Sequence, residues 1–270
     1  MDRAGERFAS WQEGIAVRRE AGLTLFFAPT AGGTDAERLP GRPARPDADA
    51  IRALAAESGK VVSFSISHQP KDHPYWVELL ALGLTFDLRG LAPGIGAQVA
   101  APGHAFGLPL ADARGLECVV LRTGPHLASA GSLMPIVRTM AALGCELASL
   151  PGLVGIGWEP AGTIMAPDYF RTTAGAWLEG GAFPALGFTA LARSPAGAMR
   201  SIGLGFFLGH ELELAARPGE SPADTARLAV RLIHDLVQNG SYSPGDHEGP
   251  TGDVLHCSFN ADMSLLHIVR

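Results

Sequence analysis

The chain has 270 residues, which is enough for one large domain or two small ones with a sizeable core. Hydrophobic residues make up 47% and charged residues 18%, so the composition excludes the disordered class. The net charge is −6 and the sequence has no basic run, which argues against binding to nucleic acid. The 34 glycines and 20 prolines predict many turns and short elements.

Neither a membrane partner nor a secretory signal is expected. No apolar run approaches the roughly 20 residues of a bilayer-spanning helix, and the charged segment Met1–Arg7 leads to no apolar stretch. The three cysteines, Cys118, Cys145 and Cys257, are odd in number and widely spaced, so we expect buried, reduced thiols. These features favour a cytoplasmic protein of bacterial type with no cofactor.

Residues 1–20 are predicted to be an N-terminal arm, followed by a single domain over residues 21–270 with a subdivision near 110–116 left open. The first elements expected are a strand over 23–28, a loop over 31–46, a helix from Asp47 or Asp49 to Gly59, a strand over 61–67, and a hairpin with strands over 84–88 and 94–99. His104 falls in a Gly/Pro-rich loop, where we expect it to be incidental.

The second half is predicted to continue with alternating strands and helices. The expected elements are a strand over 117–122, a helix capped by Ser132 and stopped by Gly144, strands over 153–158 and 163–165, a short helix over 168–177, strands over 184–192 and 201–207, and a closing hairpin over 254–259 and 265–269. Strands outnumber helices and many neighbours are joined by short turns. This pattern predicts an α+β fold: a largely antiparallel mixed sheet or sheets with about four helices packed on them. A division into two similar α/β halves is left open.

The best-defined unit runs from Ser201 to Gly240. Its residues 204–214 are predicted to be extended, with Glu211 and Glu213 on one face of the strand. A helix then begins after Ser221, with an apolar stripe formed by Leu228, Leu232, Ile233 and Leu236. Arg227, Arg231 and Asp235 are expected to point away from this stripe.

Several short motifs of the last two thirds resemble the bacterial family known only as domain of unknown function four-two-six-one. The motifs are Gly155–Trp158, Met165–Phe170, Ile202–Gly205, Glu211–Leu214, Pro244–Asp246 and Gly249. The sequence departs from the family where an Asp-Gly-Asp-Thr stretch is expected, because residues 244–247 are Pro-Gly-Asp-His here. The family has no established activity, so the resemblance implies a fold boundary more than a function.

The most reactive group of residues in the sequence is His210, Glu211 and Glu213 on the strand, with Asp246 in the loop after the following helix. If the fold brings them together, two carboxylates and a histidine could act as general acid and base or hold a divalent cation. The alternative is that Glu211 and Glu213 form the solvent face of a half-buried strand and pair with basic side chains. This structural interpretation is favoured, and no metal site is predicted.

Three further residues are candidates for binding. Trp158 and Glu159 stand at a strand end, where a tryptophan can form a platform for a ligand, although a core position is favoured. His247 follows Asp246 in the loop that departs from the family pattern. No Gly-x-Ser-x-Gly motif occurs, and neither Ser132 nor Cys145 has the surroundings of a nucleophile.

Two functional hypotheses follow from these residues. The first is a non-catalytic cytoplasmic protein that binds a protein partner, in the manner of an immunity protein or a regulator, with an acidic surface that would suit a basic partner. The second is a metal- or carboxylate-dependent hydrolase or lyase that uses Glu211, Glu213, His210 and Asp246.

Overall fold

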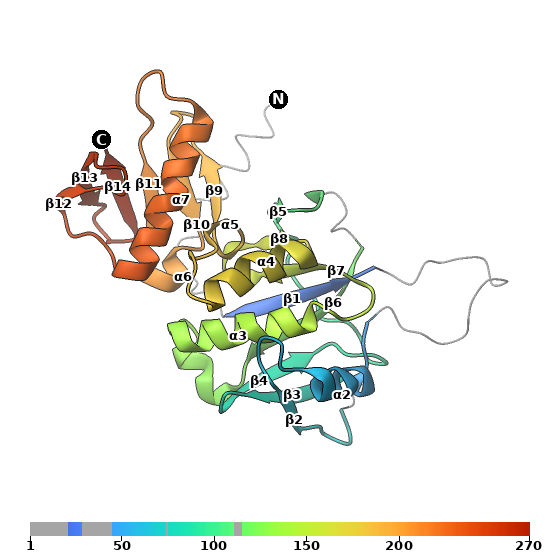
Figure 1. Cartoon of the computed structure of the whole chain (residues 1–270). Helices are drawn as coiled ribbons and strands as arrows, with labels where there is room; N and C mark the ends of the chain where they lie inside the picture. Colours follow the sequence, from blue (N-terminus) through green and yellow to red (C-terminus); the bar gives the residue numbers. More distant parts are fainter. Residues whose placement is uncertain (1–20, 29–44, 74, 111–114) are drawn as a thin grey trace.

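The computed structural model contains two mixed, mostly antiparallel sheets with helices packed against them (Figure 1). It describes residues 21–28, 45–73, 75–110 and 115–270. The α+β class predicted from the sequence is therefore confirmed. The expected arm over residues 1–20 and most of the expected loop over 31–46 lie outside the described residues.

The larger sheet has eight strands, and all neighbouring strands are antiparallel except β5 and β8. In sheet order they are β2 (Ser65–His68), β3 (Trp76–Ala81), β4 (Leu84–Arg89), β6 (Glu117–Thr123), β1 (Gly22–Phe27), β7 (Leu153–Trp158), β8 (Thr163–Met165) and β5 (His104–Phe106). The central position of β1 explains why its sequence is an almost continuous apolar run, since every residue of β1 is buried.

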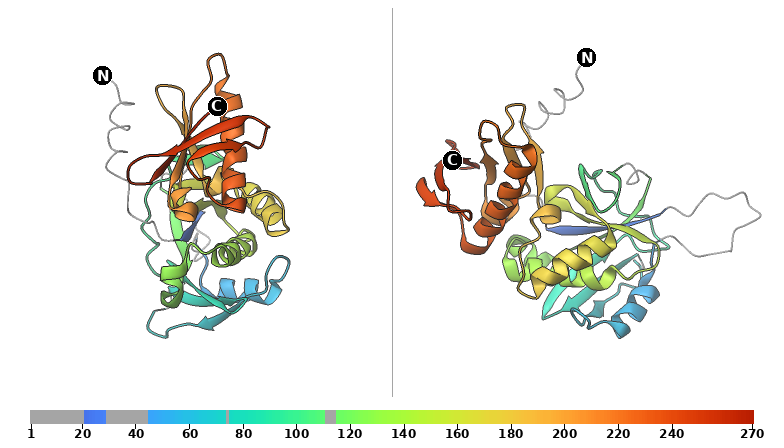
Figure 2. Two further views of the ribbon diagram at one scale, coloured as in Figure 1. Left: turned by 90° about the vertical axis from the view of Figure 1, so that its left-hand side faces the viewer. Right: turned by 45° about the horizontal axis from the view of Figure 1, so that its top comes forward.

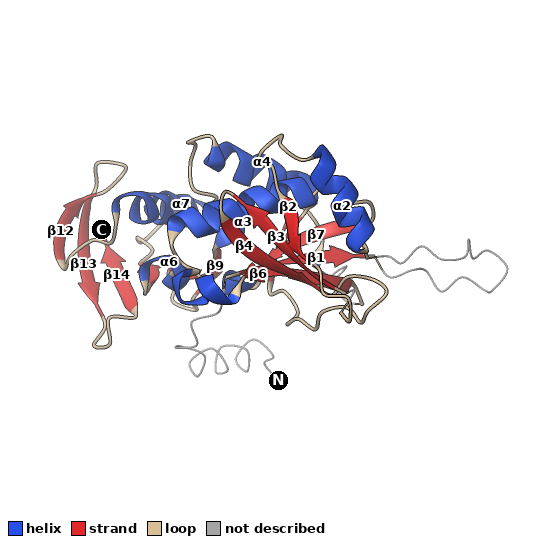
Figure 3. Ribbon diagram, turned by 90° about the horizontal axis from the view of Figure 1, so that it is seen from below, coloured by secondary structure: helices blue, strands red, loops and turns tan. Residues whose placement is uncertain are grey.

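Helices cover one face of this sheet. They are α2 (Ala48–Glu57), α3 (Met134–Leu147) and α4 (Pro167–Leu178), and Figure 3 shows them together on the same side of the strands. Leu23 and Leu25 belong to the main core, whereas Phe26, the residue after Leu25, packs with Cys118 and Ile164 in a small second cluster. Alternate residues of β1 thus fill the two faces of the sheet.

Helix α3 differs from its prediction at both ends. Leu133, not Ser132, is the residue before its first turn, and the helix continues past Gly144 to Leu147. A Cβ at Gly144 would lie 2.7 Å from Cδ1 of Leu23 and 2.9 Å from the Phe170 ring. This glycine therefore allows close packing of α3 on β1 and α4, and it does not stop the helix.

The second sheet has six strands, and its only parallel pair among the described residues is β11 with β14. In sheet order the strands are β12 (Gly245–Glu248), β13 (Val254–Phe259), β14 (Leu265–Val269), β11 (Glu211–Leu214), β10 (Met199–Ile202) and β9 (Ala190–Arg193). Helix α7 (Pro222–Asn239) packs on this sheet, and the predicted stripe from Leu228 to Leu236 is buried. The Ser221 hydroxyl accepts the Asp224 N–H at 3.2 Å, which confirms the predicted N-cap.

Some predicted strands are wrong. Residues 61–64 are not a strand, because the Glu146 carboxylate takes the N–H groups of Val61 and Val62 at 2.7 and 3.0 Å. Residues 94–99 are irregular, and β4 pairs instead with β3, a strand that was not predicted. The stretches predicted to be extended also contain an irregular turn, α5 (Ala185–Phe188), and a short helical turn, α6 (Gly205–Leu208).

Aromatic side chains join the two sheets into one core. The Trp158 ring at the end of β7 lies 4.9 Å from the ring of Phe188 and 5.3 Å from that of Phe206 in α6. Beside them, Gly203 has a φ of +85°, and a Cβ there would lie 2.7 Å from the Cβ of Ala161 in the short turn η3 (Glu159–Ala161). Figure 2 shows the second sheet and α7, coloured orange to red, on one side of the larger sheet.

The three cysteines are free and buried, as the sequence predicts. Burial raises the pKa of Cys118 to about 11 and that of Cys145 to about 12, so both are protonated, unreactive thiols at neutral pH. In the part of the chain that the structure describes, no helix has the length and apolar character needed to cross a membrane.

Candidate functional site

Glu211 at the start of β11 is held by its own neighbourhood. Its carboxylate accepts the Gly203 and Gly205 N–H groups at 2.9 and 3.0 Å, the Leu204 N–H at 3.2 Å and the Ser201 hydroxyl at 2.5 Å. These donors belong to the segment that leads from β10 into α6. The carboxylate therefore acts as a cap that fixes this turn, and its lone pairs are engaged within the protein.

Glu213 and His210 also have structural partners. Glu213 lies 3.2 Å from Nδ1 of His267, its cross-strand neighbour on β14. His210 is 6% exposed and its Nε2 lies 2.7 Å from the Ser241 hydroxyl, while its ring contacts Phe259 edge-on. The alternation predicted for the strand is thus present, and each side chain is in a different local network.

Asp246 and His247 lie on β12, at the outer edge of the second sheet. Asp246 pairs with His256 across the hairpin at 2.6 Å, and both side chains are exposed. His247 bonds to the Ser243 carbonyl at 2.7 Å and stacks on Tyr242 with ring centroids 4.9 Å apart. These contacts explain the fold of the loop after α7.

The structure does not bring Asp246 to Glu211. Strands β14 and β13 separate β11 from β12. Glu211 pairs with Leu265 at the start of β14, whereas Asp246 pairs through His256 with Val269 at the end of β14. With ordinary strand spacings the two carboxylates are about 20 Å apart. Among the described residues no three His, Cys, Asp or Glu side chains are grouped so as to hold a metal ion. The convergence that the hydrolase or lyase hypothesis requires is therefore not found among these residues.

The binding candidates Trp158 and Glu159 are parts of the structural junction. Trp158 is fully buried among the aromatic rings, so it offers no platform to a ligand. Glu159 accepts the Thr24 hydroxyl at 3.1 Å and forms an ion pair with Arg122 at 2.8 Å. Its carboxylate lies over Gly22, where a Cβ would come within 2.9 Å.

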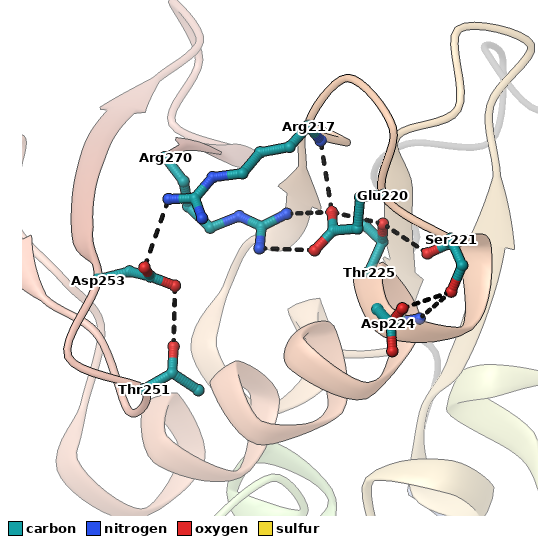
Figure 4. Close-up of polar contacts among 8 residues, drawn as sticks. All are labelled: Arg217, Glu220, Ser221, Asp224, Thr225, Thr251, Asp253 and Arg270. Atoms are coloured by element: carbon teal, nitrogen blue, oxygen red, sulfur yellow. Dashed lines mark hydrogen bonds and ion pairs between the residues drawn. The ribbon is translucent and has the colours of Figure 1, made fainter.

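A polar cluster ties the start of α7 to the end of β14 (Figure 4). Glu220 accepts two bonds from the Arg270 guanidinium and one from the Thr225 hydroxyl at 2.8 Å. The Arg270 side chain is 4% exposed. The hydrogen bonds from Arg270 lower the pKa of Glu220 to about 2. Nearby, Arg217 pairs with Asp253 at 3.4 Å. The cluster is a clamp between elements, with its charges matched internally.

An apolar groove lies between the ends of the two sheets, and we call it the β5–α7 groove. Figure 1 shows β5, at the end of the larger sheet, on the side that faces β9 and α7. The groove has a volume of about 680 Å³. It is lined by His104, Ala105, Phe106, Leu186, Leu191, Ala223, Ala226, Arg227, Val230 and Arg231. A groove of this size, apolar with a few polar groups, has the usual properties of a binding site.

The polar residues that line the β5–α7 groove are all of the basic type. Burial lowers the pKa of His104 below its ordinary value of 6.5, so this histidine is neutral at pH 7. Arg227 pairs with Asp224 on its own helix, whereas Arg231 has no ion pair within the described residues. No carboxylate is among the described residues that line the groove, although the chain as a whole has a net charge of −6.

Sequence reasoning missed these residues. His104 was expected to be incidental, and Arg227 and Arg231 were assigned only to the solvent side of α7. One signal could have revealed the groove: Ala223, Ala226 and Val230 form a second stripe of small apolar residues on α7, beside the core stripe. The opposite wall, on β5, gave no signal because a three-residue strand is too short for a pattern.

A smaller cavity of about 300 Å³ lies where α3, α4 and α7 meet. Two of its polar side chains, Arg138 and His234, have partners within the fold. Arg138 stacks over Trp177 at 4.8 Å and donates to the Leu178 carbonyl at 2.7 Å, and His234 Nδ1 accepts the Phe183 N–H at 2.9 Å. These bonds hold the end of α4 and the following loop, so the cavity belongs to the packing.

Comparison with known proteins gives no relative for this chain: no family model matches it, and no curated protein or solved structure does so either. The resemblance to domain of unknown function four-two-six-one therefore stays a prediction.

Proposed function

We propose that this protein acts by binding a protein partner in the β5–α7 groove, and that it is not an enzyme. The observation that carries the proposal is the contrast between the groove and the carboxylate candidates. Glu211, Glu213 and Asp246 are each engaged in separate structural contacts. The groove combines apolar walls with Arg231, a guanidinium for which no ion pair is found in the described residues.

The kind of site supports a binding role. Interfaces depend on apolar contact at their centre with charges at the rim that set specificity and the rate of encounter. Phe106, Leu191 and Val230 supply apolar surface, and Arg231 is exposed on α7. We infer that the protein is a regulator that works in the cytoplasm. The three cysteines of the chain are unpaired thiols, which is typical of proteins in a reducing compartment.

Site-specific photo-crosslinking in the native host tests this proposal. A benzophenone side chain at Val230, inside the groove, should form adducts with a partner that are absent when the same group is placed at Leu82. Leu82 is 75% exposed in the turn between β3 and β4. Introducing Arg231→Glu into the Val230 crosslinking protein should abolish the adducts. If Val230 gives no adducts beyond those at Leu82, the groove is not a partner site.

A further inference from the structure

The open edge of strand β5 lies inside the β5–α7 groove. Three consecutive residues of β5, His104, Ala105 and Phe106, line it. Successive side chains of a strand point to opposite faces of a sheet. Three in a row can border one cavity only where that cavity runs along the edge of the strand. The groove therefore exposes the backbone edge of β5 as well as its side chains.

The hydrogen bonds of β5 show which backbone groups face this edge. The His104 N–H donates to the Gly162 carbonyl at 3.4 Å, and the Phe106 carbonyl accepts the Ala166 N–H at 2.8 Å. Both bonds point toward β8, the neighbour of β5 in the sheet. Because the direction alternates along a strand, the N–H and C=O of Ala105 point away from β8, into the groove.

These backbone groups restrict what can fill the groove. An alkyl chain would cover the N–H and C=O of Ala105 without bonding to them, at the cost of leaving buried polar groups unpaired. An extended polypeptide satisfies both groups, as in strand addition to an open sheet edge. Its alternate side chains would reach the apolar surface of Phe106, Leu186 and Leu191.

Charge restricts the occupant further. The lining contains no carboxylate among the described residues, and Arg231 has no ion pair within the same set. Arg227 beside it is already paired with Asp224. A carboxylate on the occupant would therefore meet a guanidinium that has no ion pair within the described residues, in a lining without a described carboxylate.

We infer that the β5–α7 groove binds an extended, acidic segment of its partner, which adds to the larger sheet as a strand beside β5. The segment pairs with the backbone of Ala105, packs apolar side chains on Phe106 and Leu191, and places a carboxylate at Arg231. This inference rests on the proposed binding function and specifies the chemistry of the partner. The basic lining of the groove points to an acidic segment, in place of the basic partner expected from the net charge of the chain.

A random octapeptide display library, selected on the immobilised full-length protein, tests the inference. Selected peptides should alternate apolar residues and carry Asp or Glu. Fluorescence anisotropy should show that Arg231→Glu weakens their binding by at least about tenfold. The matched control is Arg52→Glu, on an exposed side chain of α2 outside the groove lining, and it should leave the affinity unchanged.

Two changes test the backbone pairing directly. Ala105→Pro removes the N–H that faces the groove and no hydrogen bond to β8, and proline is tolerated in an edge strand at such a position. Peptides N-methylated at alternate residues test the same pairing on the unaltered protein. Each change should reduce the affinity by about tenfold or more.

Binding that survives both changes overturns the strand-addition inference but leaves the groove as a partner site. Failure to select any peptide that depends on Arg231 also overturns the inference. The proposed function fails separately, when Val230 gives no specific crosslink.

Discussion

The Glu211 carboxylate accepts hydrogen bonds from three backbone N–H groups and one hydroxyl, and this number determines the effect of a substitution. In Glu211→Gln one acceptor oxygen becomes an NH₂ group that faces other donors. We expect the free energy of unfolding in urea to fall by about 2 kcal/mol, because donors in a partly buried turn lose their partner.

The matched control is Glu213→Gln on the same strand. Glu213 has a single cross-strand contact, with His267, and both side chains are partly exposed. Its replacement should lower the free energy of unfolding by less than about 1 kcal/mol. Equal effects of the two substitutions would contradict the capping role of Glu211.

The ion pair between Glu220 and Arg270 predicts a pH dependence of stability. The pKa of Glu220 is lowered from 4.5 to about 2 in the folded protein, so the folded state binds this proton less readily than the unfolded state. The stabilisation is therefore complete above about pH 4.5 and is lost as the pH falls toward 2. The difference in Tm between wild type and Glu220→Gln should be constant from pH 7 to 5 and should shrink below that.

Thermal melts between pH 7 and pH 3 measure this effect. Arg270→Gln provides the control, because it leaves Glu220 in place but removes the guanidinium that lowers its pKa. This variant should lose much of the same acid-sensitive stabilisation. A Tm difference between wild type and Glu220→Gln that is as large at pH 3 as at pH 7 would contradict the assignment.

At the level of single residues, the sequence predicts orientation better than partnership. Alternation correctly placed Glu211 and Glu213 on one strand face, and the Ser221 cap was correct because its acceptor and donor are three residues apart. The pairs of Glu213 with His267 and of Asp246 with His256 depend on which strands become neighbours. No local pattern contains that information, so the proposed convergence of Glu211 and Asp246 could not be tested before the sheet order was known.

At the level of elements, helix α3 fixes residues 59–62, a segment more than 80 residues earlier in the chain, through one side chain. Glu146, which is 6% exposed, accepts the N–H groups of Val61 and Val62 and, at 3.3 Å, that of Gly59. Glu146→Ala should lower the free energy of unfolding by about 2 kcal/mol, since it leaves the buried Val62 N–H and two partly buried N–H groups without their acceptor. Hydrogen exchange of the Val61 and Val62 amides should accelerate.

The control for this prediction is Glu179→Ala, at an exposed position just after α4. It should leave both the stability and the exchange at Val61 and Val62 unchanged within about 0.5 kcal/mol. Unchanged exchange at these amides in Glu146→Ala would show that the carboxylate does not hold the segment.

The contact of Glu146 with Val61 and Val62 also explains why the strand predicted to begin at residue 61 is wrong there. Residues 61–64 are apolar and β-branched enough to indicate a strand, but a side chain from α3 takes their backbone donors. The helix end predicted at Gly144 is wrong for a similar reason, because a glycine that permits close packing cannot be told from one that ends a helix by sequence alone. Long amphipathic elements such as α7 were predicted well, since periodicity alone defines them.

For the molecule as a whole, the aromatic junction around Trp158 makes the two sheets one cooperative unit. We expect wild-type protein to unfold in a single transition. Trp158→Ala should lower the free energy of unfolding by about 4 kcal/mol, because the ring is fully buried and contacts Phe188 and Phe206. Amides of β9 to β14 should then exchange faster than those of β1 to β7.

Trp76→Ala on β3 is the matched control, since its ring is only partly buried and lies far from the junction, beside Arg89. It should cost less and should leave the exchange pattern of the second sheet unchanged. If Trp158→Ala destabilises both sheets equally and keeps a single transition, other contacts suffice to couple them.

The whole-molecule arrangement was the least predictable part. The sequence indicates an α+β class, but the β5–α7 groove is formed by residues 104–106 and 223–231, which meet only because both sheets end beside each other. Its apolar character is spread over short elements that carry no motif. The candidate site therefore follows from the topology and not from any one stretch of the chain.

The pairing of β11 with β14, a strand about 50 residues later in the chain, has a consequence for biosynthesis. A growing chain on the ribosome makes Glu211–Leu214 well before Leu265–Val269, the strand that lies between β11 and β13. Until that strand emerges, the edge of β11 is unpaired and Leu212 and Leu214 lack part of their cover. Nascent chains paused after α7 should therefore be the form of this protein that depends most on chaperones.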